Sequence, residues 1–457
     1  MHNGFSESTR FPYIFQTQGE NLRYRLREHL AHRLGGKLYY GWIIVGVLFV
    51  SNLATFSPNP SFGLFVTKFE AEFGWSRSSI ALAPTLGTVF GAVFAPLLGR
   101  LVDRFGVRPL MIYGGALSAG CYFLMGGITA IWQLYLLYGV MFGVLCIGAG
   151  FLVSNVSITR WFARRRGRAT ATGMMGSSLG GLVFISVQAL LIEWFDWRVA
   201  LSAQGVFVLA LVVLPGLMLM VNSPENLGLG GHRELRVGSA EEGRESPKAT
   251  DDDWTLREAL HTPTFWLLLC GIMMNNMMVS GYFANNVPHM ESLGYSRIVA
   301  GSAWATFFFV GVFAKFTWGF IVEFTTVRWG LVLLNLGEFL GLYLLLTASR
   351  PMDLYIWATV HGFTHGPWLA LSTQVWGDYF GRGAIGRIYG TVQPAIVLAG
   401  AVGPWLGGYI FDRTGNYTLF YQTLMSMMLI GTIIYAVARP PNKSAPRASQ
   451  VNPPDMA

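Results

Sequence analysis

The run FGWSR at residues 73–77 returns 220 positions later as LGYSR at residues 293–297. Without a gap, the same offset pairs four further positions of matching kind: Gly91 with Gly311, Gly99 with Gly319, Asp103 with Glu323 and Arg108 with Arg328. Chance agreement at so many glycines and charges is improbable. The repeat therefore predicts that the chain consists of two similar halves.

Both halves are too apolar for a protein that faces water on all sides. Hydrophobic residues make up 53% of the 457 residues and charged residues only 12%, about half the charged share of an ordinary soluble domain. The 55 glycines fit the same interpretation, because small residues let helices approach closely in a membrane. The composition predicts a protein that lies in the lipid bilayer.

Twelve apolar stretches are long enough to cross a bilayer, which takes about 20 predominantly apolar residues per helix. They fall six and six on either side of one long polar stretch. The sequence thus predicts an all-α membrane protein of twelve transmembrane helices in two six-helix halves. The expected spans are 38–58, 79–99, 109–129, 132–158, 168–192, 198–221, 263–287, 298–321, 328–348, 353–376, 386–410 and 417–437.

Polar segments divide the chain further. We expect a cytoplasmic N-terminal tail over residues 1–37, a six-helix half over 38–221, a cytoplasmic linker over 222–262, a second six-helix half over 263–437 and a cytoplasmic C-terminal tail over 438–457. The first apolar run is too long for a signal peptide and lacks a small-residue cleavage site, so it is expected to be retained. Late in the linker, helical spacing of Trp254, Leu256, Leu260 and Phe265 predicts an amphipathic interfacial helix.

Lysines and arginines predict the orientation, because cytoplasmic loops carry an excess of them. If the N-terminus is inside, the inner segments hold 25 of the 32 lysines and arginines and the outer segments hold six, while Lys315 lies within a span. We therefore expect a multi-pass protein of the cell membrane with both termini in the cytoplasm. The net charge of +8 is spread over short loops and forms no basic face, so nucleic-acid binding is not expected.

The segment after the second span resembles the signature of a known protein family. The run GRLVDRFGVRP at residues 99–109 resembles the signature that follows the second helix of the major facilitator superfamily, with the expected weaker copy at 319–328. The sequence also resembles the monocarboxylate-transporter-like branch of that superfamily. The matching segments are YGW at 40–42, SPENLG at 223–228, and the glycine patterns of 161–180 and 379–415. The resemblance covers residues 38–437. It implies a secondary transporter, not an enzyme, in which one half rocks against the other.

The signature is expected to hold the cytoplasmic gate. Asp103 can pair with Arg104 or Arg108, or face the positive N-terminus of a helix in the other half. Such a cluster would form in one state and break in the other. The alternative is that these cations only anchor the topology. The gating set comprises Gly99, Asp103, Arg104, Gly106, Arg108, Glu323 and Arg328.

Lys315 is the strongest candidate for substrate binding. It lies eight residues before Glu323, which at 1.5 Å per residue is about 12 Å, close to the middle of a core about 30 Å thick. A charge there costs roughly 2.5–3.5 kcal/mol, and the equivalent residue of the first half is Ala95. The resemblance implies that this cation, usually an arginine, engages the substrate carboxylate. No further Lys or Arg stands between Arg387 and Arg413, which favours a monoanion. The alternative is a lysine that snorkels to the interface.

Three residues of the second half are candidates for carrying a proton. His361 and His365 share one face of the tenth span. Because histidine titrates near physiological pH, they could also bind the substrate anion when charged. Glu338 lies at mid-depth of the ninth span, where a buried carboxylate resists ionisation. Structural roles are the alternative for all three. Gly311 stands where animal-type members of the branch carry an acidic residue, so a coupled proton needs one of these groups or Lys315.

Polar residues of the seventh and eleventh spans could orient a substrate or join helices; they are Asn275, Asn276, Tyr282 and Gln393. Together these features predict proton-coupled transport of a small organic anion, a monocarboxylate, by alternating access in a monomer. No metal is expected, since the histidine pair lacks a third ligand, and no cofactor. The alternative is efflux of amphipathic aromatic compounds, which the 14% aromatic content permits.

Overall fold

The computed structural model describes residues 39–56, 58–145, 150–162, 166–227, 254–381 and 385–441. Throughout these ranges the chain is helical and forms no strand. The prediction of an all-α fold is confirmed.

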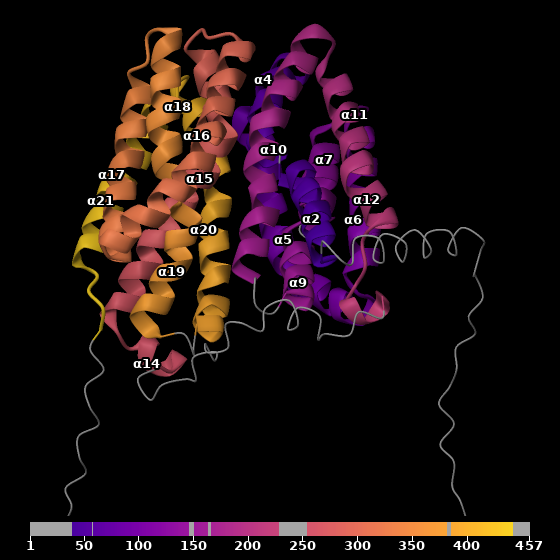
Figure 1. Ribbon diagram of the computed structural model, residues 1–457. Helices are drawn as coiled ribbons and strands as arrows, with labels where there is room; N and C mark the ends of the chain where they lie inside the picture. Colours follow the sequence, from indigo (N-terminus) through magenta and orange to yellow (C-terminus); the bar gives the residue numbers. More distant parts are fainter. Residues whose placement is uncertain are drawn as a thin grey trace, which may run out of the picture.

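Figure 1 shows the helices in two groups that stand side by side. We call helices α2 to α12 the N-terminal bundle: α2 (Gly41–Phe56), α3 (Pro58–Ser61), α4 (Gly63–Phe73), α5 (Arg77–Phe105), α6 (Val107–Met125), α7 (Ile131–Leu134), η1 (Tyr135–Phe142), α9 (Phe151–Trp161), α10 (Arg166–Trp194), α11 (Trp197–Val208), η2 (Leu209–Val213) and α12 (Leu214–Met218). The short η3 (Pro224–Leu227) follows.

Helices α14 to α21 form the C-terminal bundle: α14 (Leu256–Leu260), α15 (Pro263–Ser292), α16 (Arg297–Phe324), α17 (Val327–Leu346), α18 (Pro351–His365), α19 (Trp368–Phe380), α20 (Ile385–Thr414) and α21 (Thr418–Val437).

Among the residues that the structure describes, eight helical stretches are long and apolar enough to cross a membrane: α5, α10, the continuous α11–η2–α12, α15, α16, α17, α20 and α21. Of the other four expected spans, one contains α6 with 19 residues, and three contain shorter helices, namely α2, α7 to α9, and α18 with α19. Gly366 and Pro367 separate α18 from α19, because proline removes a backbone donor from a helix interior. Every expected span is thus mostly helical where the structure describes it.

The repeated pentapeptides form the same turn in both bundles. Gly74 and Gly294 adopt φ values of +67° and +91°, which glycine reaches without steric cost. Ser76 and Ser296 then cap α5 and α16, each accepting a hydrogen bond from the backbone N–H three residues later. The repeat therefore marks two equivalent helix starts. We call this side of the molecule the Arg77 end, and the opposite side, where α5 finishes, the Asp103 end.

The two bundles pack closely toward the Arg77 end. A Cβ atom at Gly408 of α20 would lie 2.7 Å from the backbone of Arg77, and one at Gly181 of α10 would lie 2.7 Å from the ring of Phe308. Farther along the same helices, Gly99 of α5 and Gly390 of α20 have open space at the corresponding position. In Figure 1 the Arg77 end is at the top beside α4, and the Asp103 end is at the bottom beside α9 and α14.

The expected amphipathic helix before the seventh span is short. Helix α14 covers five residues, and Thr262 then caps α15 by accepting from the Phe265 N–H, with Pro263 as the first helical residue. The side chains of Trp254, Leu256 and Leu260 pack against the core of the C-terminal bundle. Within the described residues, the apolar face of this segment thus rests on protein.

Candidate functional site

Lys315 lies in the second half of α16 and remains accessible to solvent. Its Nζ donates a hydrogen bond across the two bundles to Oγ of Ser178 on α10, at 2.5 Å. None of the ion pairs between described side chains includes Lys315. A cation without an acidic partner among these side chains can take an anion as its counter-charge.

The packing of α10 decides where Ser178 points. Cβ atoms at Gly176 and Gly180 would collide with the backbone carbonyls of Phe49 and Leu53 on α2, so this face of α10 is closed against its own bundle. Ser178 is 200° around the helix from Gly176 at about 100° per residue, and it therefore faces α16. Nothing in the sequence distinguishes it from its neighbour Ser177.

A second polar cluster lies inside the C-terminal bundle, between α15, α17 and α18. Glu338 is fully buried, and its Oε1 lies 3.1 Å from Nδ1 of His365. Its Oε2 accepts from Nδ2 of Asn275 at 2.7 Å, and the same amide nitrogen lies 3.1 Å from Oδ1 of Asn335. Both oxygens of a buried carboxylate are thus satisfied, which a buried charge requires.

Sequence reasoning missed Asn335, although a signal was present. Asn335 precedes Glu338 by three residues on α17, and residues three apart on a helix are neighbours on one face. A buried amide beside a buried acid in an apolar helix is a recognisable pair.

Aromatic rings surround this cluster. His361 is fully buried, with its ring centroid 4.8 Å from that of Tyr282 and 5.6 Å from that of Phe307. The ring of His365 stacks on Phe307 at 5.4 Å and meets Phe283 at 5.7 Å. The structure therefore brings together five of the sequence candidates: Asn275, Tyr282, Glu338, His361 and His365.

The remaining candidates of α15 and α20 lie elsewhere. Asn276 donates to the carbonyl of Ile396 at 2.8 Å and so joins α15 to α20. Gln393 of α20 is half-buried, and its Oε1 has no hydrogen-bond partner among the described residues. No described hydrogen bond or ion pair connects Lys315 to the Glu338 cluster.

The expected gating residues are of two kinds: those with few contacts, described first, and the two arginines that bond helix ends. Asp103 is exposed, and its only ion pair within the described chain is a long contact of 3.9 Å with Arg160 of its own bundle. Arg104 extends over the ring of Phe105. Gly99 has no close neighbour, and the side chain of Glu323 lies outside the described residues.

Arg108 and Arg328 instead tie helix ends together within each bundle. Arg108 donates to the carbonyl of Leu217 at the end of α12, and its backbone N–H donates to Oδ1 of Asn222 at 2.9 Å. Gly106 adopts φ +86° against the Asn222 side chain. Arg328 makes the equivalent bonds to the carbonyls of Tyr435 and Ala436 at the end of α21.

The Arg77 end holds a polar seam between the bundles. All four N–H groups that begin α5 are satisfied: Ser76 accepts from residues 79 and 80, while Asp412 of α20 accepts from the backbone of Arg77 at 3.1 Å and of Ser78 at 2.9 Å. A carboxylate at a helix N-terminus also gains from the helix dipole. The side chain of Arg77 bonds Glu70 and Tyr417 and lies over Phe411.

The second repeat arginine behaves in the same way. Arg297 pairs with Glu291 of its own bundle at 2.8 Å, and both residues bond the hydroxyl of Thr67 on α4 of the other bundle. The repeated pentapeptides thus supply two related cross-bundle contacts at one end of the molecule.

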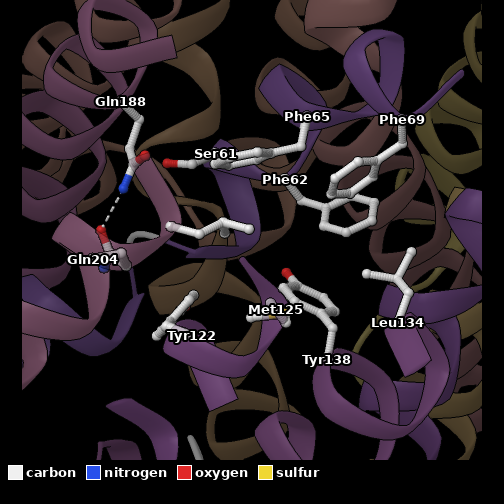
Figure 2. Close-up of a pocket in the computed structure, with 11 residues that line it drawn as sticks. Ser61, Phe62, Phe65, Phe69, Tyr122, Met125, Leu134, Tyr138, Gln188 and Gln204 are labelled. Carbon is white, nitrogen blue, oxygen red and sulfur yellow. Dashed lines mark hydrogen bonds between the residues drawn. The ribbon is translucent and has the colours of Figure 1, made fainter. Parts of the chain in front are cut away.

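Figure 2 shows a small cavity inside the N-terminal bundle, lined mainly by aromatic and aliphatic side chains. At one side Nε2 of Gln188 donates to Oε1 of Gln204 at 2.9 Å. The volume of this cavity, about 20 Å³, holds little more than a water molecule. It lies apart from Lys315. Among the described residues no three His, Cys, Asp or Glu side chains gather as metal ligands.

Comparison with known proteins places this architecture in a family. The family model described as the Major Facilitator Superfamily matches residues 44–296 and 272–455. Monocarboxylate transporter 13 of Bos taurus is 26% identical over 404 residues, covering 86% of this chain and 88% of that protein. The oxalate:formate antiporter of Oxalobacter formigenes is 25% identical over 401 residues, covering 87% of this chain and 90% of that protein.

Solved structures agree in fold. The D-xylose-proton symporter superposes with a TM-score of 0.67 at 13% identity, covering 88% of this chain and 98% of that one. A bacterial homolog of the human lysosomal transporter Spinster, in an inward-facing and occupied conformation, gives a TM-score of 0.62 at 16% identity over 88% and 97%. These identities establish the fold alone. With the family match spanning nearly all helices of both bundles, the chain belongs to the Major Facilitator Superfamily and is a membrane transporter related to monocarboxylate transporters.

Proposed function

We propose that the protein transports a small organic anion, a monocarboxylate, across the cell membrane by alternating access, coupled to protons. One observation carries the proposal: the ammonium of Lys315 lies in the second half of α16 between the bundles, accessible and without an ion-pair partner among the described side chains. Placing that charge inside the bilayer costs roughly 2.5–3.5 kcal/mol, so a fold that does not need it retains it for a ligand. A single cation suits a single carboxylate.

The related proteins support the same class of substrate. Two of them are named for monocarboxylates and for oxalate and formate, all of which carry a carboxylate at neutral pH. Lysine offers a point charge in place of the planar fork of arginine, so binding by charge and hydrogen bonds fits this chain better than bidentate recognition.

The proton is assigned to the pair of His365 and Glu338. Their 3.1 Å contact joins a base and an acid inside one bundle, where a carboxylate charge without a partner is costly. Asn275, Asn335 and the rings of Phe283, Phe307, His361 and Trp368 surround the pair. One proton keeps the buried pair neutral overall, and its gain or loss changes the charge beside the transport pathway.

The proposed orientation of the protein in the membrane follows from the distribution of its cationic residues. The excess of lysine and arginine puts the Asp103 end and both termini in the cytoplasm. Since the bundles join at the Arg77 end, this conformation faces the cytoplasm, and Asp103 is exposed because its gate is open. Asp103 would then close against the start of α20 in the opposite state. The transporter is proposed to act as a monomer, with domains as the sequence predicts: helical halves over 38–221 and 263–437 and a cytoplasmic linker between them.

Uptake into proteoliposomes tests the function. Labelled formate, lactate, pyruvate and benzoate are offered with and without an inward proton gradient, alongside an amphipathic aromatic cation. The unmodified protein should accumulate at least one of the acids when the gradient is applied. Lys315→Gln should abolish that uptake, and Lys315→Arg should retain part of it because the charge remains. Transport of the aromatic cation alone would favour efflux of amphipathic compounds instead.

A further inference from the structure

Ser178 has an unusual hydrogen-bonding state for a serine within a helix. Such serines commonly donate to a backbone carbonyl of the preceding turn, and the neighbouring Ser177 does so, to Met174 at 2.7 Å. Ser178 instead accepts from Nζ of Lys315. Among the described residues its own hydroxyl proton has no acceptor. Its side chain is 7% exposed, so an unused donor is held at this place.

The contact between Lys315 and Ser178 leaves several hydrogen-bond donors for one ligand. An ammonium has three N–H groups and a hydroxyl has one proton. With one ammonium proton used for the Ser178 oxygen, the remaining ammonium protons and the Ser178 proton are free among the described residues. A carboxylate accepts through two oxygens and matches this arrangement.

The position of the pair joins the ligand to both bundles. Along the seam between α10 and α16, Ala189 meets Gly301 nearest the Arg77 end and Gly181 meets Phe308 farther in. Ser178 and Lys315 follow as the next contact toward the Asp103 end. Beyond it the side chain of Phe324 at the end of α16 is 88% exposed. Of these three contacts between α10 and α16, the pair thus lies nearest the Asp103 end.

We propose that Ser178 is a second substrate-binding residue and that the carboxylate is held between Lys315 of the C-terminal bundle and Ser178 of the N-terminal bundle. This rests on the proposed function and adds the contribution of the other bundle to the same site. The anion itself then bridges the two bundles. Binding of the carboxylate strengthens the link across α10 and α16, and the empty site keeps only the direct bond from lysine to serine.

Kinetics of Ser178→Ala test the proposal, with Ser177→Ala as the matched control on the same helix turn. Loss of a hydrogen bond to a charged group should raise KM for the transported acid roughly 10- to 100-fold, with a smaller effect on the maximal rate. Ser177→Ala should leave KM unchanged, because that hydroxyl bonds only its own helix. Ser178→Thr should keep most of the affinity, since the hydroxyl remains.

A chemical readout separates binding from folding. In protein whose native cysteines are replaced by alanine, Ser178→Cys should react with a methanethiosulfonate reagent, and the transported acid should slow that reaction. Equal KM values for Ser178→Ala and Ser177→Ala, or no protection of the introduced thiol, would overturn the role of Ser178 while leaving the proposed function intact. Absence of uptake of every acid by the unmodified protein would instead overturn the proposed function, and this inference with it.

Discussion

In the proposed mechanism, the contact between His365 and Glu338 would give the coupled proton a defined place. Nδ1 of the imidazole lies 3.1 Å from Oε1 of the carboxylate, and Asn275 holds Oε2. Because the second oxygen is occupied by an amide donor, a proton gained by the pair lies on the side of Oε1. In the proposed mechanism, therefore, this one atom pair would carry the coupling.

His365→Gln should uncouple transport from the proton gradient. Glutamine can still bond Glu338 but cannot take up a proton, so exchange of labelled for unlabelled acid should continue while accumulation driven by a pH gradient is lost. Counterflow and gradient-driven uptake in proteoliposomes measure the two quantities. His361→Gln is the comparison, since no described hydrogen bond links that ring to the Glu338 side chain. Full accumulation by the His365 variant would assign the proton to another group.

The sequence singles out some of these residues and hides others. Lys315 is visible because a charge at mid-span is costly and its counterpart is Ala95. Ser178 is invisible, since only the packing of Gly176 and Gly180 on α2 turns it toward the other bundle. For Asn275 the sequence leaves open whether it orients a substrate or joins helices, and the structure places it against Glu338 and Asn335 inside the bundle. Depth follows from chain position, whereas the direction of a side chain depends on which faces pack.

At the scale of elements, α5 and α20 form the contact that defines this conformation. The first N–H groups of α5 are completed by Asp412 from the other bundle, and Oγ1 of Thr85 on α5 donates to the carbonyl of Ala401 on α20 at 2.7 Å. When the bundles separate at this end, the N-terminus of α5 loses its anionic partner and must bond water. Asp412 therefore stabilises the conformation in which the Arg77 end is closed.

Asp412→Asn should shift the protein toward opening at the Arg77 end. An asparagine can keep one acceptor oxygen but loses the charge, and a charge at a helix N-terminus contributes about 0.3–1 kcal/mol, or up to ~2 kcal/mol when partly buried. The population of the opened form should rise roughly two- to thirty-fold by the same figures. A cysteine at Thr85 reports the change through its alkylation rate from the Arg77 side.

Asp196→Asn is the matched control for that experiment. Asp196 lies at the start of α11 and pairs with Arg198 of its own bundle, so its loss changes charge at the same end without touching the seam. Alkylation at position 85 should remain as in the parent protein. Equal rates in the Asp412 and Asp196 variants would show that the cap does not set the equilibrium.

The sequence predicts most of the helices, but it does not predict where they are interrupted or cut short. Apolar length predicts each span, and the Gly-x-Ser pattern of residues 74–76 and 294–296 marks two helix starts. The break between α18 and α19 falls at Gly366 and Pro367, which apolar length does not register, and the brevity of α14 depends on tertiary contacts. For α14, the side chain of Trp254 meets Phe380 at a ring distance of 5.9 Å, a contact that helical periodicity does not contain.

At the scale of the whole molecule, the repeat predicts two halves but not which end is closed. Two similar bundles can meet at either end, so the repeat alone does not choose between the two arrangements. The structure shows contact at the Arg77 end, where both repeat arginines join the bundles. Alternating access requires that these contacts break when the Asp103 end closes.

A reversible crosslink across the seam tests whether the bundles must separate at the Arg77 end during transport. A Cβ at Gly301 would lie 2.9 Å from Cβ of Ala189, so Ala189→Cys with Gly301→Cys should form a disulfide after a small shift, in a background with Cys121, Cys146 and Cys270 changed to alanine. Uptake should stop on oxidation and return with a reductant, while binding of the acid from the Asp103 side persists because Lys315 stays accessible. Each single cysteine variant should transport under both conditions. Undiminished transport by fully crosslinked protein would mean that this end never opens, and rocking of one bundle against the other would then be the wrong mechanism.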